Sequence, residues 1–459
     1  MRGLADNAIF IGLMLIVIFS ALAHGVVEPW SFFIFELTAA LLVLMWVIKV
    51  AMDKKFTLVI PHTAWPLAAL ILVGLVQCVS WNDGAGIRQS LSFDVEATRG
   101  TTLVLCSLLA LSLLAANFLT GEGRLRALLH ILIVFAVVMA VIGLAQRFSG
   151  SDGGYWLRPS VKTGFGPFIN RDHFAGYMEL FIGLPVALIA TRCVGGEKTM
   201  VYGAAAMLMG VAAVFTLSRG GMISILAEMI FLAAMGYRHY QTRRAHHEPG
   251  AAGGAMSAVA VVIILAAIVT GVVWMGAEPV INRVATGDPN SSDLSKAQTF
   301  YGMRGEIWED TWTMIRHNPL IGVGLGAYET AYPAYALDSG MRGVVAEAHN
   351  DYLQVLADAG VIGAGLALWF VLALFRAFAR GARSPNPLMA AIALGGGAGL
   401  FGLLLHSFFD FNLHLPSHAV VFLLLSMVIS NVGDTVEKPV SSKVLSTPVA
   451  SGVIREVSS

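Results

Sequence analysis

The feature that most constrains this chain is a succession of apolar runs, each close to the length that crosses a bilayer. A membrane-spanning helix needs about 20 predominantly apolar residues. Twelve stretches are candidates: 8–24, 30–50, 62–80, 101–119, 127–146, 174–191, 199–217, 222–237, 254–276, 361–379, 387–407 and 417–431. We therefore predict an all-α polytopic membrane protein with about twelve transmembrane helices and one long helical loop outside the bilayer.

The composition excludes a soluble globular fold. Hydrophobic residues make up 57% of the 459 residues and charged residues only 13%, whereas a soluble domain carries about 25% charged residues. The formal net charge is zero, so bulk charge gives no indication of a nucleic-acid partner, and we expect none. The partner that the composition does indicate is the lipid bilayer.

The distribution of Lys and Arg among the short loops predicts the orientation, because these residues are enriched on the cytoplasmic side. One set of loops holds Lys49, Lys54, Lys55, Arg124, Arg126, Arg192, Lys198, Arg238, Arg243, Arg244, Arg376, Arg380 and Arg383. The opposite set holds only Arg88, Arg99, Arg147, Arg158, Lys162, Arg171 and Arg219. Both termini are then cytoplasmic. The chain divides into nine spans (1–276), an outer loop with the catalytic motifs (277–360), three spans (361–431) and a disordered cytoplasmic tail (432–459).

The outer loop is expected to contain two helices. Apolar and aromatic side chains recur at helical spacing within residues 303–318, which predicts an amphipathic helix that Asn318-Pro319 should end. A second helix is expected over the sequence HNDYLQVLADAG, and Gly360 should stop it.

His349 lies at the start of that second helix, at the mouth of the tenth span. A helix N-terminus carries roughly half a positive charge, which disfavours an imidazolium beside it. A neutral imidazole is what a general base needs near neutral pH. The residues alone leave two interpretations open, a general base and a polar residue that caps the helix.

Two arginines are candidates for binding an anion. Arg219 lies in the hairpin sequence TLSRGGMIS, where Gly220 and Gly221 would let a ligand or a backbone approach closely. Its planar fork suits a phosphate group, although an interfacial arginine can also extend to lipid headgroups. Arg304 begins the amphipathic helix, and on spacing alone it is best explained by an exposed ion pair with Glu309.

The segment HSFFDFNLHLPSH places His406, Asp410, His414 and His418 four residues apart. On a continuous helix they would form a stripe able to bind a metal, but Pro416 interrupts the last step. We therefore expect no metal site, and interpret the segment as a polar outer loop whose Asp410 and Asn412 hold backbone or substrate.

The sixth span opens with the sequence NRDHFAGYMEL, which puts Arg171, Asp172 and His173 at the interface. Glu179 falls inside the apolar run. An acid within a membrane span is a functional hypothesis by default, and the alternative is that Glu179 pairs with a neighbouring span.

Four segments in this order resemble the O-antigen ligase family, membrane glycosyltransferases that also include O-antigen polymerases and bacterial protein O-oligosaccharyltransferases. They are SRGG at 218–221, RGEIW at 304–308, NPLIGVGLGAY at 318–328 and AHNDYL at 348–353. The layout of about twelve spans with one long outer loop is similar as well. The sequences NRDHFAGY and DFNLHLP resemble segments found in a subgroup of these proteins.

The resemblance implies that a glycan on undecaprenyl diphosphate is transferred to an acceptor hydroxyl at the outer face of a bacterial inner membrane. The outer loop is then periplasmic. Catalysis is expected to be metal-independent and to need no cofactor, with His349 as the base and Arg219 and Arg304 binding the diphosphate. A base that directs attack opposite the leaving group inverts the anomeric centre. Further candidate substrate contacts are Arg171, His173, Asp410, Asn412 and His414.

Several activities fit these features. An O-antigen ligase would use lipid A–core as its acceptor, and we place it first. An O-antigen or exopolysaccharide polymerase would use a second lipid-linked glycan, and a protein oligosaccharyltransferase would use a protein. From a different class, a polysaccharide or lipid transporter would show paired broken helices and charges near the bilayer midplane.

Overall fold

The computed structural model describes residues 2–53, 58–82, 88–149, 164–245, 292–336 and 345–437. In this part of the chain, ten helices are long and apolar enough to cross a membrane. They are α1 (Arg2–Leu22), α2 (Pro29–Asp53), α4 (Val95–Phe118), α5 (Glu122–Phe148), α6 (Arg171–Ala190), α7 (Glu197–Phe215), α8 (Arg219–Ala245), α12 (Asp351–Gly381), the continuous run Pro387–His406, and α15 (Pro416–Glu437). The run Pro387–His406 consists of α13 (Pro387–Ala391), the π-helical segment η4 (Ile392–Gly396) and α14 (Gly397–His406).

The fold class predicted from the sequence, an all-α polytopic membrane protein, is confirmed. Two of the twelve expected spans are not among the ten. One is the shorter apolar helix α3 (Ala64–Gln77) of 14 residues, and the other, 254–276, lies outside the described residues. Helix α15 runs to Glu437, beyond the predicted end at 431, and the rest of the tail is also outside the described residues.

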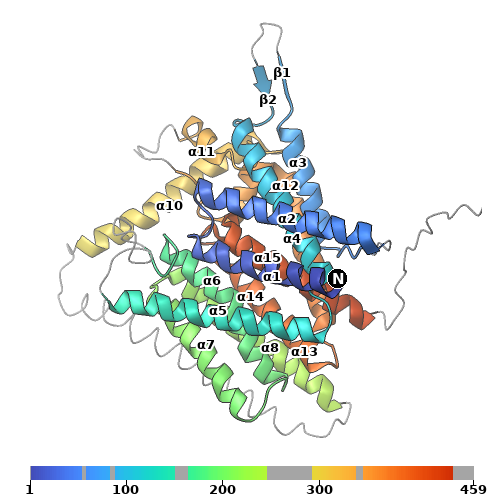
Figure 1. Cartoon of the computed structure of the whole chain (residues 1–459). Helices are drawn as coiled ribbons and strands as arrows, with labels where there is room; N and C mark the ends of the chain where they lie inside the picture. The colour runs from blue at the N-terminus through green and yellow to red at the C-terminus, as the bar shows by residue number, and fades with distance from the viewer. Residues whose placement is uncertain are drawn as a thin grey trace, which may run out of the picture.

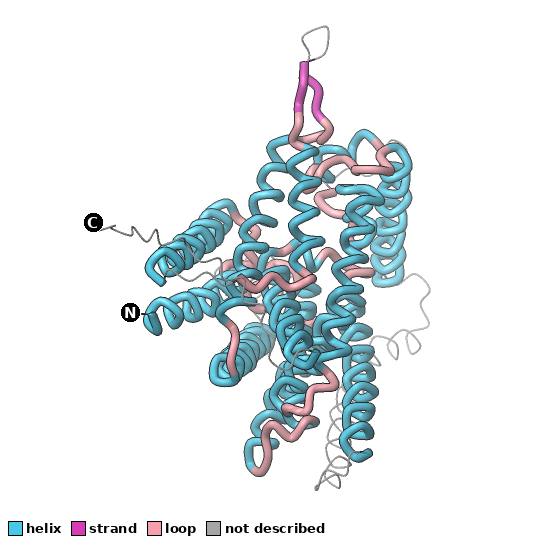
Figure 2. The backbone as a smooth tube through the Cα atoms, turned by 90° about the vertical axis from the view of Figure 1, so that its right-hand side faces the viewer, coloured by secondary structure: helices cyan, strands magenta, loops and turns pink. Residues whose placement is uncertain are grey.

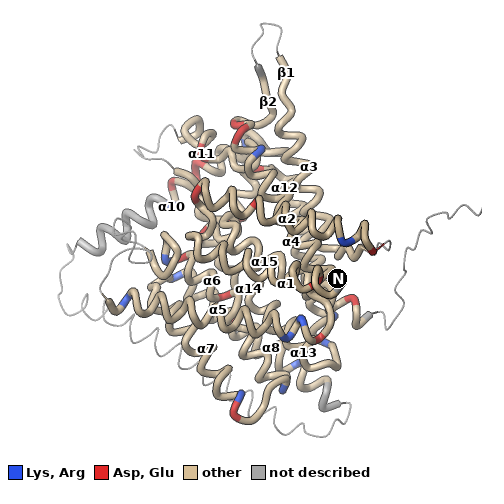
Figure 3. The backbone as a smooth tube through the Cα atoms, viewed as in Figure 1, with Lys and Arg blue, Asp and Glu red and all other residues tan. Residues whose placement is uncertain are grey.

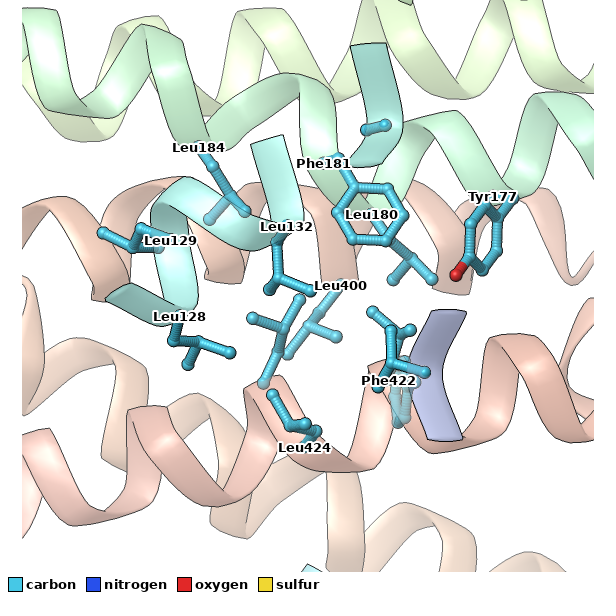
Figure 4. Packing of buried hydrophobic residues seen from close by; sticks show 14 of the residues in the cluster. Leu128, Leu129, Leu132, Tyr177, Leu180, Phe181, Leu184, Leu400, Phe422 and Leu424 are labelled. Carbon is cyan, nitrogen blue, oxygen red and sulfur yellow. The ribbon is translucent and has the colours of Figure 1, made fainter. Parts of the chain in front are cut away.

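Helix α6 passes through the centre of the bundle and packs on α5, α7, α8 and α14 (Figure 1). Nearly all of its side chains are buried, including Tyr177, Leu180, Phe181 and Leu184, as expected for a helix that is apolar on every side (Figure 4). Glycines let α6 approach the Pro387–His406 run closely, because a Cβ atom on Gly399 would lie 2.7 Å from the backbone oxygen of Glu179.

The remaining elements lie outside these helices and are called the outer layer; the hairpin among them projects from the top of the bundle (Figure 2). They are α10 (Ser292–His317), α11 (Tyr328–Ala331), the 3₁₀ turns η3 (Tyr332–Ala334) and η5 (Asn412–His414), and an antiparallel hairpin of β1 (Ser80–Asn82) and β2 (Arg88–Ser90). Helix α10 confirms the predicted amphipathic helix and ends one residue before Asn318-Pro319, although it starts earlier than expected. The hairpin was not predicted from the sequence.

The predicted stop at Gly360 is a break within α12, where Gly360 adopts φ 62° and ψ −161°. The loop after α10 lies against this break. Its Val323 N–H donates to the Ala357 carbonyl (2.8 Å), and its Pro319 carbonyl accepts from the Val361 N–H (2.8 Å). Backbone groups released by the break are therefore hydrogen-bonded by the loop. The first turns of α12 are thereby joined to the outer layer while the rest of the helix can cross the bilayer.

The end of α1 and the start of α15 lie on the same side of the bundle. Ser417, at the start of α15, donates its backbone N–H to the Gly25 carbonyl just after α1 (3.4 Å). The beginning of α1 and the end of α15 therefore share the opposite side (Figure 1). Several Lys and Arg residues gather along the right-hand and lower edges of the view, near the start of α1 and near α13 (Figure 3).

We predict that the layer containing α10 faces the periplasm. In a variant without the three native cysteines, Glu329→Cys should react with a membrane-impermeant thiol reagent in intact spheroplasts, because Glu329 is exposed next to the start of α4. Gly123→Cys is the matched control at the other end of α4, where an added Cβ atom meets no atom within 4 Å. It should react only after lysis, and the reverse pattern would contradict the predicted orientation.

Candidate active site

His349 immediately precedes α12 but does not cap it. The cap is Asn350, whose side-chain oxygen accepts the backbone N–H groups of Tyr352 (3.0 Å) and Leu353 (3.1 Å). Interpreting His349 as the capping residue is therefore wrong. The His349 backbone has φ 50°, a left-handed conformation that costs a residue other than glycine about 1 kcal/mol. Such strain is often found at functional sites, where the surrounding structure holds the residue in place.

The His349 imidazole is paired with a buried carboxylate. Its Nδ1 atom lies 3.2 Å from Oδ1 of Asp410, and its ring edge meets Phe411 at 5.0 Å between centroids. The Asp410 side chain is 1% exposed and that of His349 33%. A carboxylate on Nδ1 favours the tautomer with its proton there, which leaves Nε2 as the basic nitrogen.

Asp410 is held in its charged form. Burial alone would raise the pKa of this carboxyl, but the hydrogen bond from His349 and the nearby imidazole of His173 outweigh burial, and the net shift of the pKa is downward. The backbone N–H of Phe411 also donates to Asp410 (3.0 Å). The site therefore contains a fixed negative charge behind the imidazole.

Asp351, the first residue of α12, anchors the loop that carries Asp410. Its carboxylate accepts the Ser407 hydroxyl (2.7 Å), the Leu413 N–H (3.2 Å) and a bond from Nδ1 of His414 (2.7 Å). The backbone N–H of Asp351 also donates to the Ser407 carbonyl (2.9 Å). These four bonds fix residues 407–414, the reaction loop, against the helix that follows His349.

His414 belongs to this anchor. Burial would lower the pKa of its imidazole, but the charge of Glu347 and the hydrogen bond to Asp351 raise it to about 10. The raised pKa favours the charged imidazole in this anchor, and the predicted contact of His414 with substrate stays a prediction.

Both candidate arginines lie at the reaction loop. Arg304 donates from Nη1 to the carbonyl of Phe409 (2.7 Å), the residue before Asp410. The backbone of Gly220, next to Arg219, faces the same residue, because a Cβ atom on Gly220 would lie 3.1 Å from Cβ of Phe409. Arg219 is the first residue of α8, and its side chain is exposed. The structure therefore brings Arg304 and His349 to Phe409 and Asp410, and the start of α8, which carries Arg219, packs against Phe409.

The two glycines after Arg219 lie where neighbouring segments pack closely. A Cβ atom on Gly220 would also lie 3.1 Å from the His406 ring, and one on Gly221 would lie 2.6 Å from Cβ of Ala175. The close approach expected at these glycines is thus made by neighbouring protein segments, and an approach by a ligand stays a prediction. They let α6 and the end of α14 pack against the first turn of α8.

The structure places the other three predicted contacts, His173, Asn412 and Arg171, in different surroundings. His173, on the first turn of α6, places Nε2 3.8 Å from Oδ2 of Asp410 and its ring against Phe411, so it belongs to the cluster. Asn412 is fully buried, and its side chain packs against Gly176 of α6. Arg171 is exposed at the start of α6, and its contact with substrate stays a prediction.

The histidines of residues 406–418 do not form a stripe, because α14 ends at His406 and α15 begins only at Pro416. Each has a different partner. His406 bonds Glu179 (2.9 Å), His414 bonds Asp351, and Nε2 of His418 bonds the His173 carbonyl (2.8 Å). The geometry that could have bound a metal along one helix face is therefore not formed.

Fold and site together define a polytopic membrane protein in which a histidine paired with a buried carboxylate lies near an arginine on α10. A model of the family described as O-Antigen ligase matches residues 204–370, a range that includes Arg219, Arg304 and His349. Residues 204–370 are therefore similar to the O-antigen ligase family, and this similarity points to glycosyltransferase activity on lipid-linked glycans. No curated protein matches the chain. The reaction loop lies outside the matched range.

We predict that changes at His349 and at its neighbour Asn350 separate function from stability. Asn350→Ala should lower the apparent melting temperature by roughly 2 °C, since loss of a cap costs about 1 kcal/mol. His349→Asn should melt no lower than the wild type, because asparagine adopts the left-handed conformation readily. The measurement is thermal unfolding in detergent, and a large loss of stability in His349→Asn alone would indicate a structural histidine.

Proposed function

We propose that the protein transfers a glycan from undecaprenyl diphosphate to an acceptor hydroxyl at the outer face of the bacterial inner membrane. The activity is proposed to be that of an O-antigen ligase, with lipid A–core as the acceptor. Donor and acceptor are both anchored in lipid, which accounts for a base at the end of a membrane bundle rather than in a soluble domain.

The observation that supports this proposal most is the position of the His349–Asp410 pair beside the two arginines. An acyl or glycosyl transfer needs a proton acceptor next to a site for the leaving group, and this arrangement supplies both. The distance of 3.2 Å between Nδ1 of His349 and Asp410 is that of a base held by its orienting carboxylate.

The proposed reaction follows from these roles. Nε2 of His349 takes the proton of the acceptor hydroxyl while the hydroxyl oxygen bonds to the anomeric carbon. The bond between that carbon and the phosphate oxygen breaks, and its electron pair leaves with the lipid diphosphate. Arg219 and Arg304 offset the negative charge that develops there. Asp410 stabilises the imidazolium, and attack opposite the leaving group inverts the anomeric centre.

The polymerase alternative differs only in the acceptor, a second lipid-linked glycan, and the same residues would perform the same steps. Purified protein in vesicles with one lipid-linked donor distinguishes the two. A ligase should transfer glycan only when lipid A–core is added, whereas a polymerase should lengthen the donor glycan without it. Loss of donor in vesicles without an ion gradient would also exclude a gradient-driven transporter.

We predict that His349→Asn and Asp410→Asn both lower the rate of transfer while donor binding persists. His349→Asn removes the base and should abolish transfer. Asp410→Asn keeps the shape but removes the charge behind the imidazole, and a loss of about 10²- to 10⁴-fold is expected. His317→Asn, at an exposed histidine in the last turn of α10, is the matched control and should retain full activity. A wild-type rate in His349→Asn would exclude the base assignment.

The arginines are expected to act through geometry as well as charge. Arg304→Ala and Arg219→Ala should weaken donor use strongly, and replacement by lysine should restore only part of it, since lysine lacks the planar fork. Arg316→Ala changes an exposed arginine on the same helix as Arg304, stacked on Trp312, and should leave transfer unchanged. Equal losses in Arg316→Ala and Arg304→Ala would attribute the effect to the general charge of α10.

A further inference from the structure

A glutamate and a histidine form a buried pair within the bundle, beneath the candidate site. Oε1 of Glu179 on α6 lies 2.9 Å from Nδ1 of His406 at the end of α14. Their side chains are 0% and 1% exposed. Groups this polar are costly inside a membrane protein unless they are paired, and they are rarely retained there without a function.

His406 contacts three segments near the candidate site: the start of α8, the reaction loop and α6. Its ring packs on Gly220, next to Arg219, as the 3.1 Å approach to a Cβ atom there shows. Its carbonyl accepts the backbone N–H groups of Phe409 (2.7 Å) and Asp410 (3.1 Å). Through Glu179 it is joined to α6, which carries His173. One residue thus connects the start of α8, the reaction loop and the central helix.

We propose that Glu179 is a positioning residue for the transfer reaction. By holding the His406 ring through Nδ1, it fixes the distance between Arg219 at the start of α8 and Asp410 in the reaction loop. The separation between the diphosphate and the base is set by the same contact. This inference rests on the proposed function, because it assigns the pair a purpose only if those two groups act on one substrate.

A second buried glutamate offers a matched comparison. Glu228 on α8 is also 0% exposed, and its carboxylate lies in a notch between helices, near Gly183 of α6 and Gly402 of α14. Unlike Glu179, it makes no hydrogen bond to His406 within the described part of the chain. Both glutamates are therefore buried in the same bundle, and only Glu179 bonds His406, the residue that contacts both α8 and the reaction loop.

The test is a double-mutant cycle on the full-length protein in vesicles, with kcat and KM for the lipid-linked donor measured per folded molecule. Glu179→Gln keeps the size of the side chain but replaces the charge-assisted hydrogen bond to His406 with a weaker neutral one, and His406→Gln removes the ring. Each should lower kcat about 10- to 100-fold, as expected when reacting groups are displaced by about 1 Å, with KM changed less than about 3-fold. Glu228→Gln should keep kcat within about 3-fold of the wild type.

The double variant Glu179→Gln/His406→Gln should be no slower than the slower single variant, because the two residues act as one unit. The positioning role would be overturned if the losses of kcat in the two single variants multiply in the double variant, or if Glu179→Gln has the wild-type kcat. The proposed function would still stand in either case, because the wild-type protein transfers glycan. A purely structural pair would lower the amount of folded protein and leave kcat unchanged, which also overturns the inference. If His406→Gln does not fold, the comparison of kcat between Glu179→Gln and Glu228→Gln decides, and equal values would overturn the positioning role. A wild-type protein that uses no lipid-linked donor overturns both proposals.

Discussion

The geometry of the site depends on the hydrogen bonds of one carboxylate, that of Asp351. Three donors from the reaction loop converge on it, among them the Ser407 hydroxyl and the His414 ring. These bonds join the first turn of α12 to the loop between α14 and α15, although the bonded residues are 56 to 63 positions apart in the chain. Because they are made, His349 meets Asp410, and the carbonyl of Phe409 comes within reach of Arg304.

The membrane explains why this network is dense. Near the ends of the spans, backbone and side-chain polar groups have little water to bond with, so the protein itself must satisfy them. The break of α12 at Gly360 follows the same rule, since the loop after α10 takes up the backbone groups that the break releases. A loop satisfied in this way is rigid, and rigidity is what an acid–base pair and an anion site need in order to act on one bond.

Much of the fold could be predicted from the sequence, because hydropathy and helical periodicity are local properties. The apolar runs gave the spans, and the aromatic spacing near Trp308 gave α10. Pairings across the fold could not be predicted. Nothing in the spacing joins His349 to Asp410, so the carboxylate was expected to hold backbone or substrate. His349 could not be told from a cap until Asn350 was seen to fill that role. Glu179 was expected either to act or to pair, and its partner, His406, is 227 residues away.

The central claim is that Arg219 and Arg304 bind the leaving diphosphate on the side of the reaction loop that His349 faces. An experimental structure in lipid nanodiscs, with a non-hydrolysable analogue of the lipid-diphosphate glycan donor, tests it most directly. The account predicts diphosphate oxygens within about 3 Å of both guanidinium groups and the anomeric carbon facing Nε2 of His349 across a space for the acceptor hydroxyl. Diphosphate bound away from both arginines, or an anomeric carbon turned away from His349, would contradict it.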